Sequence, residues 1–461
     1  MKMVSMKNVC ALLFLGVLCC ISSVTPTGNI SKGTADGSET WGYVEVRPGA
    51  QMFWWLYESP NKPNHTSKPW PTILWLQGGP GESGVAYGNF GEIGPLDADL
   101  KSRNSTWLQK ADLLFVDSPV GVGFSYVEDR SLCAKTDLET TIDLMTLLKV
   151  IYDGNETTES RPFYIFGEHY GGKVALTLGL AILQATKTEE LKLQLEGVAL
   201  GNSWISPEDY VFSWGPLLKD VSRIDEVGLN QSNRFEKVYK ILALKIQDQI
   251  AKEEYEYATD SFFSLLNVIY DRSNDVDLLN FLLDDRDDSS FMTTKVSKRL
   301  GNKHYAMVSE TNSTDYDTLM DGPIRQKLKI IPSHVEWGEQ SIYAFVAMED
   351  DYLRPRISEV DELLSKGVTV TVYNGQLDVI CATKGTEAWI KKLKWDGLST
   401  YLNLRRTPIY YGEDKSTTKG FFKSYQNFAF YWILEAGHSV PVDQPFVSLE
   451  MVGNIMNTLN V

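Results

Sequence analysis

The stretch FYIFGEHYGG, residues 163–172, decides the fold that this sequence predicts. A run of apolar, β-prone residues ends in a turn flanked by Gly167 and Gly171, and a helical pattern follows directly. A strand, a strained turn and a helix together form a nucleophile elbow, which holds its central side chain exposed above a sheet. The central residue of this elbow is His169. A Gly-x-His-x-Gly-Gly turn is weak evidence by itself, so its surroundings decide what it means.

Strand-like and helix-like segments alternate around this elbow. Compact apolar runs that end in turn residues predict strands at residues 72–76, 113–116, 163–166 and 195–200. Apolar residues spaced three or four apart predict helices at residues 138–152 and 173–185. Further strands are expected at residues 368–373 and 428–434, and a hairpin at residues 41–46 and 52–57. The alternation predicts an α/β fold with a mostly parallel central sheet and helices on both faces.

The first residues predict entry into the secretory pathway. Lys2 and Lys7 precede an apolar run at residues 9–21, so we interpret residues 1–25 as a signal peptide. An uncleaved anchor is the alternative, although the run is short for a membrane span. Sequons that suit a secreted or lysosomal glycoprotein occur at Asn29, Asn64, Asn104, Asn155, Asn230 and Asn312.

The remaining chain divides into a core and an insertion. The alternating pattern occupies residues 26–206 and 317–461. Residues 207–316 between them are charge-rich and helical, so they predict an inserted helical cap. With 461 residues, of which 43% are hydrophobic, the chain can bury a large core, which excludes wholesale disorder.

The net charge limits the classes of binding partner, and the cysteine count limits the possible disulfide bonds. The 44 basic and 60 acidic residues give a net charge of −16. Without a basic stripe, nothing in the sequence supports nucleic-acid binding. We expect no membrane association once the leader is cleaved. Outside the leader only Cys133 and Cys381 remain, and whether they pair stays open.

Two downstream motifs supply partners for the elbow. NGQLD, residues 374–378, places Asp378 just after a strand, and AGHSVP, residues 436–441, places His438 just after a later one. Elbow, acid and base is the order of the triad in α/β-hydrolases, whose sites lie beyond the carboxyl ends of parallel strands. The glycines of WLQGGPG, residues 75–81, let backbone N–H groups approach an oxygen closely, as an oxyanion hole requires. These motifs predict an α/β-hydrolase fold; a surface Asp, a loop His and an ordinary Gly-Pro turn are the alternatives.

Taken together, the motifs resemble those of a known family. The segments WLQGGPG, GNFGEIGP, DSPVGVGFSY, FGEHYGG, NGQLD and GHSVPVDQP are similar to those of the serine carboxypeptidases, peptidase family S10. DGPIRQKLKIIP at residues 321–332 and EAWIKKLKW at residues 387–395 resemble more narrowly the retinoid-inducible serine carboxypeptidase branch. The resemblance begins at Trp41, covers nearly the whole remaining chain and is weakest across the cap.

The resemblance implies roles for particular residues. His438 would be the general base and Asp378 its orienting partner, and the backbone amides of Gly79 and Tyr170 would form the oxyanion hole. The C-terminal carboxylate of a peptide substrate would be held by a network of Trp75, Gln77, Glu92 and Glu168. Because adjacent carboxylates cannot all ionise, binding of a further one would be favoured at acidic pH. Neither a cofactor nor a metal is expected.

The elbow departs from the family at one position. Family members have Ser where this chain has His169, and the serine oxygen is the nucleophile that forms the ester intermediate. We therefore expect a secreted or lysosomal homologue that binds peptide C-termini and has lost peptide hydrolysis. Two alternatives remain: an active carboxypeptidase, if His169 functions unusually or is a sequence error, and a zinc site of His169, His438 and Asp378. Glu82 after the GGPG segment and Ser439 after the base are smaller departures.

Overall fold

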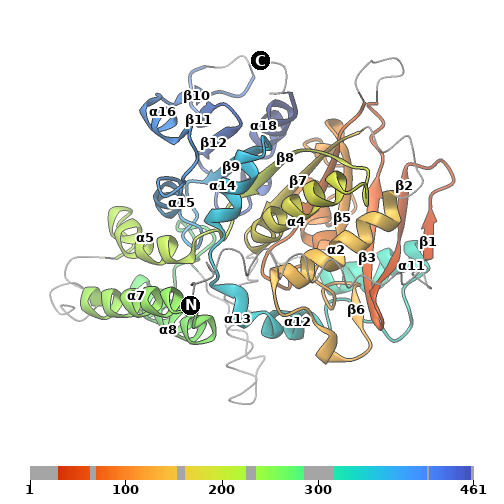
Figure 1. Ribbon diagram of the computed structural model, residues 1–461, viewed down its shortest axis with the longest axis horizontal. Helices are drawn as coiled ribbons and strands as arrows, with labels where there is room; N and C mark the ends of the chain where they lie inside the picture. The colour runs from red at the N-terminus through yellow and green to blue at the C-terminus, as the bar shows by residue number, and fades with distance from the viewer. Residues whose placement is uncertain are drawn as a thin grey trace, which may run out of the picture.

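A central β-sheet covered by helices on both faces forms the framework of the protein (Figure 1). The computed structural model describes residues 30–62, 69–152, 161–224, 235–284, 316–412 and 415–457. The strands are β1 (Ile30–Gly33), β2 (Glu39–Arg47), β3 (Ala50–Tyr57), β4 (Thr72–Leu76), β5 (Asp112–Val116), β6 (Tyr126–Val127), β7 (Pro162–Glu168), β8 (Gln194–Gly201), β9 (Thr369–Gly375), β10 (Thr407–Ile409), β11 (Gly420–Tyr425) and β12 (Phe428–Ile433).

The described residues also form α-helices and several short π- and 3-10 helices, which lie between and beyond the strands in the chain. The α-helices are α2 (Asp137–Tyr152), α4 (Tyr170–Lys187), α5 (Pro207–Asp220), α7 (Phe235–Ala251), α8 (Tyr255–Ser273), α10 (Tyr316–Leu319), α11 (Arg325–Leu328), α12 (Ser341–Ala347), α13 (Glu349–Tyr352), α14 (Ile357–Ser365), α15 (Thr383–Ile390), α16 (Leu398–Asn403), α17 (Val440–Asp443) and α18 (Pro445–Asn457). The π- and 3-10 helices are η1 (Gly84–Ile93), η2 (Trp107–Gln109), η3 (Arg130–Leu132) and η4 (Met320–Ile324).

The strand order places the parallel strands at the centre of the sheet. Within the described residues the order is β1-β2-β3-β5-β4-β7-β8-β9-β12-β11-β10, with β6 paired to β3. The central strands, in the order β5-β4-β7-β8-β9-β12, are all parallel to one another. Both edges are antiparallel, so the sheet as a whole is mixed. The predicted parallel sheet with helices on both faces is thus confirmed for its centre.

Local sequence patterns predicted these elements closely. The strand expected at residues 72–76 is β4, and the expected hairpin is formed by β2 and β3, which pair antiparallel. The helix expected from residue 173 is α4, which begins earlier, at Tyr170. The difference arises because Gly171 and Gly172 look like turn residues in the sequence but lie in the first turn of the helix.

Alternate residues of each central strand face two separate apolar layers, because side chains of a strand point to opposite faces. Leu74 and Leu76 of β4 belong to the layer formed with α2, α4 and α14. Ile73 and Trp75 of the same strand face the layer formed with η1 and α18. Burial on both faces explains the unbroken apolar runs that marked these strands in the sequence.

Helices α5, α7 and α8 lie together beside the sheet, in the range predicted to form the cap (Figure 1). Pro207 starts α5, where its fixed φ suits the first helical turn. Helices α7 and α8 pack on each other, and α8 also packs on α13. The helical character of the described part of residues 207–273 agrees with the expectation, and the boundaries of a separate cap remain a prediction.

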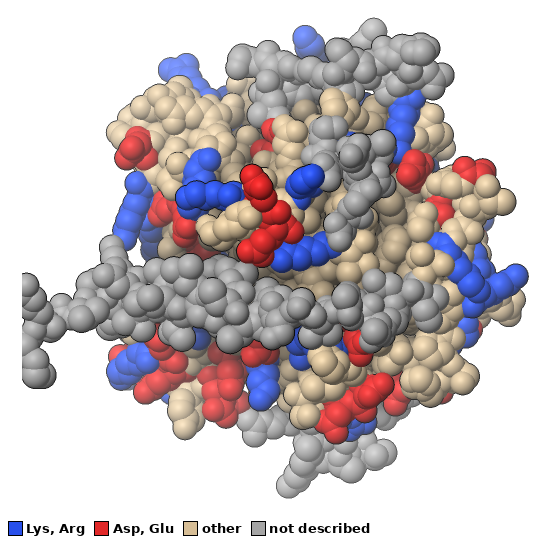
Figure 2. All heavy atoms as spheres, turned by 45° about the vertical axis from the view of Figure 1, so that its right-hand side comes forward, with Lys and Arg blue, Asp and Glu red and all other residues tan. Residues whose placement is uncertain are grey.

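Acidic and basic side chains are interspersed on the surface. On the face drawn in Figure 2, lysine and arginine lie beside aspartate and glutamate. Within the described ranges, no helix combines the length and the apolar character needed to cross a bilayer.

Candidate active site

The elbow places His169 between the end of β7 and the start of α4. Its backbone has φ 48° and ψ −118°, a strained conformation for a residue with a side chain. A Cβ atom at Gly167 would collide with Gly171, and a Cβ atom at Gly171 would collide with the carbonyl oxygen of Leu76. Both positions require glycine because the backbone segments touch. The turn thus holds His169 at the carboxyl edge of the parallel strands, where its side chain is buried.

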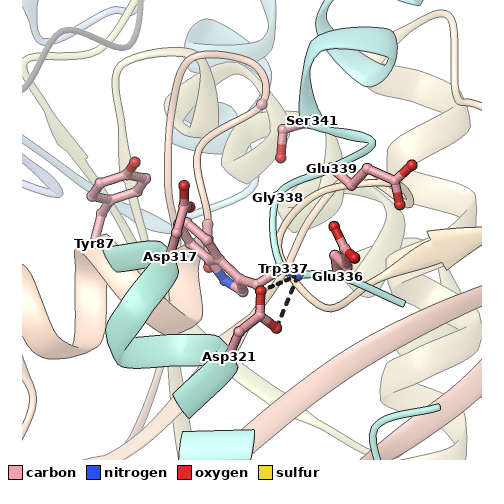
Figure 3. A pocket seen from close by; sticks show the side chains of 10 residues that line it. Tyr87, Asp317, Asp321, Glu336, Trp337, Gly338, Glu339 and Ser341 are labelled. Carbon is pink, nitrogen blue, oxygen red and sulfur yellow. Dashed lines mark hydrogen bonds between the residues drawn. The ribbon is translucent and has the colours of Figure 1, made fainter. Parts of the chain in front are cut away.

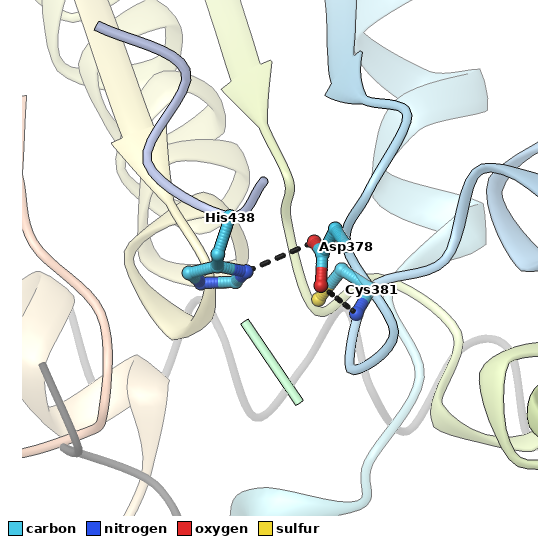
Figure 4. A group of neighbouring side chains, drawn as sticks. All are labelled: Asp378, Cys381 and His438. Carbon is cyan, nitrogen blue, oxygen red and sulfur yellow. Dashed lines mark hydrogen bonds and ion pairs between the residues drawn. The ribbon is translucent and has the colours of Figure 1, made fainter. Parts of the chain in front are cut away.

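Asp378 and His438 form a hydrogen-bonded pair beside the elbow. Asp378 follows β9 and His438 follows β12, and these two strands are parallel neighbours. The Nδ1 atom of His438 lies 2.9 Å from Oδ2 of Asp378 (Figure 4). Burial lowers the pKa of His438, but the carboxylate of Asp378 outweighs burial, so the pKa is raised from its usual value. This is the geometry of a general base and its orienting partner.

Two further donors hold the Asp378 carboxylate. The side-chain amide of Asn202 donates to Oδ2, and the backbone N–H of Cys381 donates to Oδ1 at 3.1 Å. Asn202 itself accepts a hydrogen bond from the N–H of Gly375 at 3.1 Å. Sequence reasoning missed Asn202. Its position directly after β8 is the signal that could have found it, since sites of such sheets lie at the carboxyl ends of strands.

A segment after α8 ties together the loops that carry the acid and the base. The carbonyl oxygen of Leu278 accepts hydrogen bonds from Val379 and Ile380, both at 3.0 Å. The carbonyl oxygen of Leu279 accepts the backbone hydrogen bond of His438 at 2.8 Å. The range predicted as the cap therefore helps to hold both loops, and no pattern in the sequence indicated this.

The imidazole of His169 lies between the base and the predicted oxyanion hole. Its Nδ1 accepts a hydrogen bond from the N–H of Gly79 at 3.3 Å, and its Nε2 lies 3.5 Å from the hydroxyl of Tyr352. Its ring centroid is 5.1 Å from that of His438. Burial lowers the pKa of His169 well below its usual value, and positive charge on His438 and Lys173 lowers it further. The ring is therefore neutral, as acceptance at Nδ1 requires.

The two residues predicted to form the oxyanion hole come from different loops, Tyr170 from the elbow and Gly79 from the loop that follows β4. Tyr170 is the first residue of α4, so its amide belongs to the donors at the start of that helix. Gly79 has φ +109°, a conformation that favours glycine. Because the amide of Gly79 already bonds to His169, a carbonyl oxygen would have to displace the imidazole to reach it.

The residues predicted to bind the substrate carboxylate form one connected network. The indole N–H of Trp75 donates to Oε1 of Gln77 at 2.6 Å. The amide of Gln77 donates to Glu92 at 3.0 Å and to Glu168 at 3.1 Å. The hydroxyl of Ser439 donates to Glu168 at 3.3 Å. All four predicted residues are therefore brought together, with Ser439 as an additional member.

Burial sets the protonation of this network. Burial raises the pKa of Glu92 to about 7, although hydrogen bonds with Gln77 and Glu168 lower it in part. Glu92 lies on η1, which approaches the network so closely that a Cβ atom at Gly88 would collide with the Trp75 ring. At acidic pH the network is therefore partly protonated and can accept another carboxylate.

Glu82 brings a further carboxyl group into the site. Its side chain lies over Gly79, since a Cβ atom at Gly79 would be 3.5 Å from the Cγ atom of Glu82. Burial raises the pKa of Glu82 to about 7, while His438 and a hydrogen bond from Gln77 lower it in part. In the sequence Glu82 was noted only as a departure from the family. In the structure its carboxyl group interacts with His438 and with Gln77 of the network.

The zinc alternative is not supported by the geometry. Among the described residues, the side chains close enough to hold a metal ion are Asp378, Cys381 and His438, and His169 is not one of them (Figure 4). Hydrogen bonds already engage both oxygens of Asp378. Burial raises the pKa of the Cys381 thiol well above its usual value, which disfavours the thiolate that a metal needs. Cys381 and Cys133 are both free and buried, so they do not pair.

One predicted glycosylation site can be located. Asn104 is exposed just before η2, and the hydroxyl of Thr106 in its sequon donates to the carbonyl oxygen of Ile93 at 2.9 Å. The remaining sequons and the predicted signal peptide lie outside the described residues: Asn29, Asn64, Asn155, Asn230, Asn312 and residues 1–25.

The elbow, the Asp378–His438 pair and the loop of Gly79 meet at the carboxyl ends of the parallel central strands, which defines an α/β-hydrolase. The serine carboxypeptidase family profile matches residues 29–458. The chain belongs to the serine carboxypeptidase family.

Similar proteins cover nearly the whole chain. Serine carboxypeptidase-like 51 of Arabidopsis thaliana is 52% identical over 458 residues, which cover 96% of this chain and 98% of that protein. The retinoid-inducible serine carboxypeptidase of Rattus norvegicus is 45% identical over 423 residues, which cover 90% of this chain and 91% of that protein. The crystal structure of a prohormone-processing carboxypeptidase from Saccharomyces cerevisiae shares the fold, with a TM-score of 0.74, 22% identity and 91% of each chain covered.

Proposed function

We propose that this protein is a serine carboxypeptidase homologue of the secretory or lysosomal pathway that binds peptide C-termini without hydrolysing them. The observation that carries the proposal is the hydrogen bond from Gly79 to Nδ1 of His169, at 3.3 Å. One side chain replaces the nucleophile and also engages a donor that an oxyanion would need.

Loss of hydrolysis is supported by the surroundings of His438, the residue in the position of the general base. The ring of His438 has its hydrogen bond with Asp378, and in the described part of the chain no serine hydroxyl is paired with it. Removing the nucleophile of such a triad costs about 10⁶ in kcat. A neutral, buried imidazole that accepts a hydrogen bond at Nδ1 has no free lone pair on that atom for attack on an amide.

Retention of binding is supported by the network around Gln77. Its amide reaches both Glu92 and Glu168, and Trp75 orients it from the other side. The raised pKa of Glu92, about 7, leaves this network partly protonated at acidic pH, which favours a carboxylate ligand there. The ligand class is therefore peptides or proteins with a free C-terminus.

An active carboxypeptidase is the second candidate. The intact Asp378–His438 pair, 2.9 Å apart, favours it because a binding protein does not need a general base. Resequencing the gene would reveal a serine codon in place of His169 if the sequence is in error.

The test uses the purified protein and pairs of peptides that differ only in a free or an amidated C-terminus. We expect binding of the free acid at about pH 5, weaker binding at about pH 8 and weak binding of the amide. Mass spectrometry should detect no released C-terminal residue, and a fluorophosphonate should not label the elbow. Release of single residues at acidic pH would establish the active enzyme instead.

A further inference from the structure

The described residues line two cavities of similar size. The first has Gly81 and Tyr87 in its lining and belongs to the surroundings of the candidate active site (Figure 3). The second, of about 440 Å³, lies between α18 and the strands at one edge of the sheet. We call it the edge groove, and its lining includes Thr407, Phe422, Tyr431, Val447, Glu450 and Met451. No step of the proposed function uses these residues.

The edge groove has two walls, each formed by one regular element of the fold. One wall is a single face of α18, on which the lining residues recur every three or four positions from Val447 to Asn454. At 1.5 Å per residue this face is about 10 Å long. The other wall is a row across three strands, in which Phe422 of β11 pairs with Thr407 of β10 and with Tyr431 of β12.

The walls are apolar and aromatic except for one hydroxyl group. The rings of Phe422 and Tyr431 have centroids 4.6 Å apart, and Val447 and Met451 are buried opposite them. Tyr431 is 4% exposed, and its hydroxyl has no hydrogen-bond partner within the described ranges. Unlike the fully buried hydroxyl of Tyr373, it belongs to a ring that lines a cavity. Because a desolvated hydroxyl without a partner is costly, a ligand that hydrogen-bonds to it is favoured.

Charge selects a cationic ligand for the edge groove. Glu450 on α18 is exposed, and in the described part of the chain it forms no ion pair. None of the described lining residues is basic. The guanidinium of the neighbouring Arg406 lies on the opposite face of the sheet, 4.9 and 5.1 Å from the ring centroids of Phe421 and Trp432. Together with the net charge of −16, this arrangement favours a cation over an anion.

The dimensions favour a small molecule over an added strand. In the described sheet β10 is the last strand, so one of its edges is open. Pro408 in the middle of β10 has no N–H to donate to another strand, and proline at an open edge opposes strand addition. The volume of the edge groove lies within the range of small-molecule sites.

We infer that the edge groove binds an arylalkylamine, which is a flat aromatic ring joined by a short chain to an ammonium group. The ring packs between α18 and the rings of Phe422 and Tyr431, since aromatic rings favour one another. A polar atom of the ring forms a hydrogen bond with the hydroxyl of Tyr431, and the ammonium group pairs with Glu450. This site is separate from the proposed binding of peptide C-termini and adds a second ligand class.

The test measures binding to the whole protein by isothermal titration calorimetry. Tryptamine, which has a ring N–H and an ammonium group, should bind about tenfold more tightly than indolepropionate, because the same ring then carries a carboxylate that Glu450 repels. E450Q should remove this difference. Y431F should weaken the binding of tryptamine about fivefold and leave that of naphthylethylamine, whose ring has no N–H, unchanged. E256Q, which removes an exposed charge on α8, should change nothing.

The outcomes decide whether the edge groove is an amine site. Equal affinity for tryptamine and indolepropionate, or a preference that survives E450Q, overturns the inference. If tryptamine does not bind at millimolar concentration, the inference is also wrong. Glu450 is exposed, so E450Q tests the site even if Y431F fails to fold. Peptides with a free C-terminus should bind the wild type and E450Q equally, so failure of either proposal can be recognised separately.

Discussion

The Nδ1 atom of His169 accepts a hydrogen bond from the backbone N–H of Gly79 at 3.3 Å. In an active enzyme of this fold such an amide stabilises the oxyanion of the transition state. Here the imidazole holds that donor in the resting protein, while its ring lies against the ring of His438, with centroids 5.1 Å apart. A single side chain thus separates an otherwise assembled acid–base pair from a substrate carbonyl.

Replacement of His169 by serine should create acidic carboxypeptidase activity. Serine is smaller, so the amide of Gly79 becomes available, and its hydroxyl can be deprotonated by His438. A nucleophile is worth about 10⁶ in kcat, so release of C-terminal residues should become measurable by mass spectrometry. H169A vacates the same space without a nucleophile and should stay inactive, and H169S/H438A should lose the gained activity. Equal activity of H169A and H169S would contradict this reasoning.

Replacement of Glu82 by glycine should strengthen the binding of peptide C-termini, chiefly at neutral and alkaline pH. Glu82 faces the network, and because its pKa is raised to about 7 it is ionised above that pH and repels a bound carboxylate. We expect about tenfold tighter binding at about pH 8 and little change at about pH 5, measured by fluorescence anisotropy. E82Q keeps the size and removes the charge, so an effect of E82G that E82Q lacks would show that space, not charge, is the cause.

The stability of the protein should fall as pH rises from about 4.5 to about 7, and E92Q should flatten this dependence. Burial raises the pKa of Glu92 from 4.5 to about 7, so between these values the folded state binds more protons than the unfolded state. The free energy of unfolding therefore decreases with pH across that window. Buried Asp117, with a pKa of about 6, acts in the same direction, whereas His169, whose pKa is lowered, opposes it.

The measurement is the urea midpoint as a function of pH for the wild type and E92Q. Between about pH 4.5 and about pH 7 the free energy of unfolding of the wild type should fall by about 3 kcal/mol more than that of E92Q. E256Q serves as the control because that carboxyl group is exposed. Parallel curves for all three proteins would show that Glu92 titrates normally.

Replacement of Gly171 by alanine should destabilise the elbow by about 2 kcal/mol or more, because the new Cβ atom meets the backbone oxygen of Leu76, which cannot move independently. The matched control is G453A in α18, where the nearest atom is the flexible side chain of Lys110 at 3.5 Å. There alanine should be neutral or stabilise the helix by about 0.5–1 kcal/mol. Chemical denaturation of both variants provides the comparison, and similar losses in both would contradict a tight elbow.

Many of the strands and helices could be predicted from the sequence because they depend on local patterns of side chains. The strand at residues 72–76, the helix that contains residues 138–152 and the hairpin of β2 and β3 follow from side-chain periodicity. The elbow, the acid and the base are each placed by short motifs at strand ends, and their order alone implies that they meet.

Other features depend on contacts between distant segments and were not predicted. Helix η1 contains Gly84 and Gly88, and glycine is required there because a Cβ atom would meet the carbonyl oxygen of Val116 or the ring of Trp75. Asn202 reaches Asp378 only because β8 and β9 are neighbours in the sheet. Similarly, the two single cysteines stay apart only because the fold buries each in its own place.

The chemical change at position 169 was evident from the residues, since an imidazole replaces a hydroxyl. Only the tertiary structure determines that the Nδ1 atom of this ring accepts a hydrogen bond from the N–H of Gly79. The loop of Gly79 and the elbow are 90 residues apart, and only the packing of β4 against β7 brings that amide to Nδ1. Periodicity and motifs report on neighbours along the chain, whereas hydrogen bonds of this kind depend on how separate strands are placed side by side.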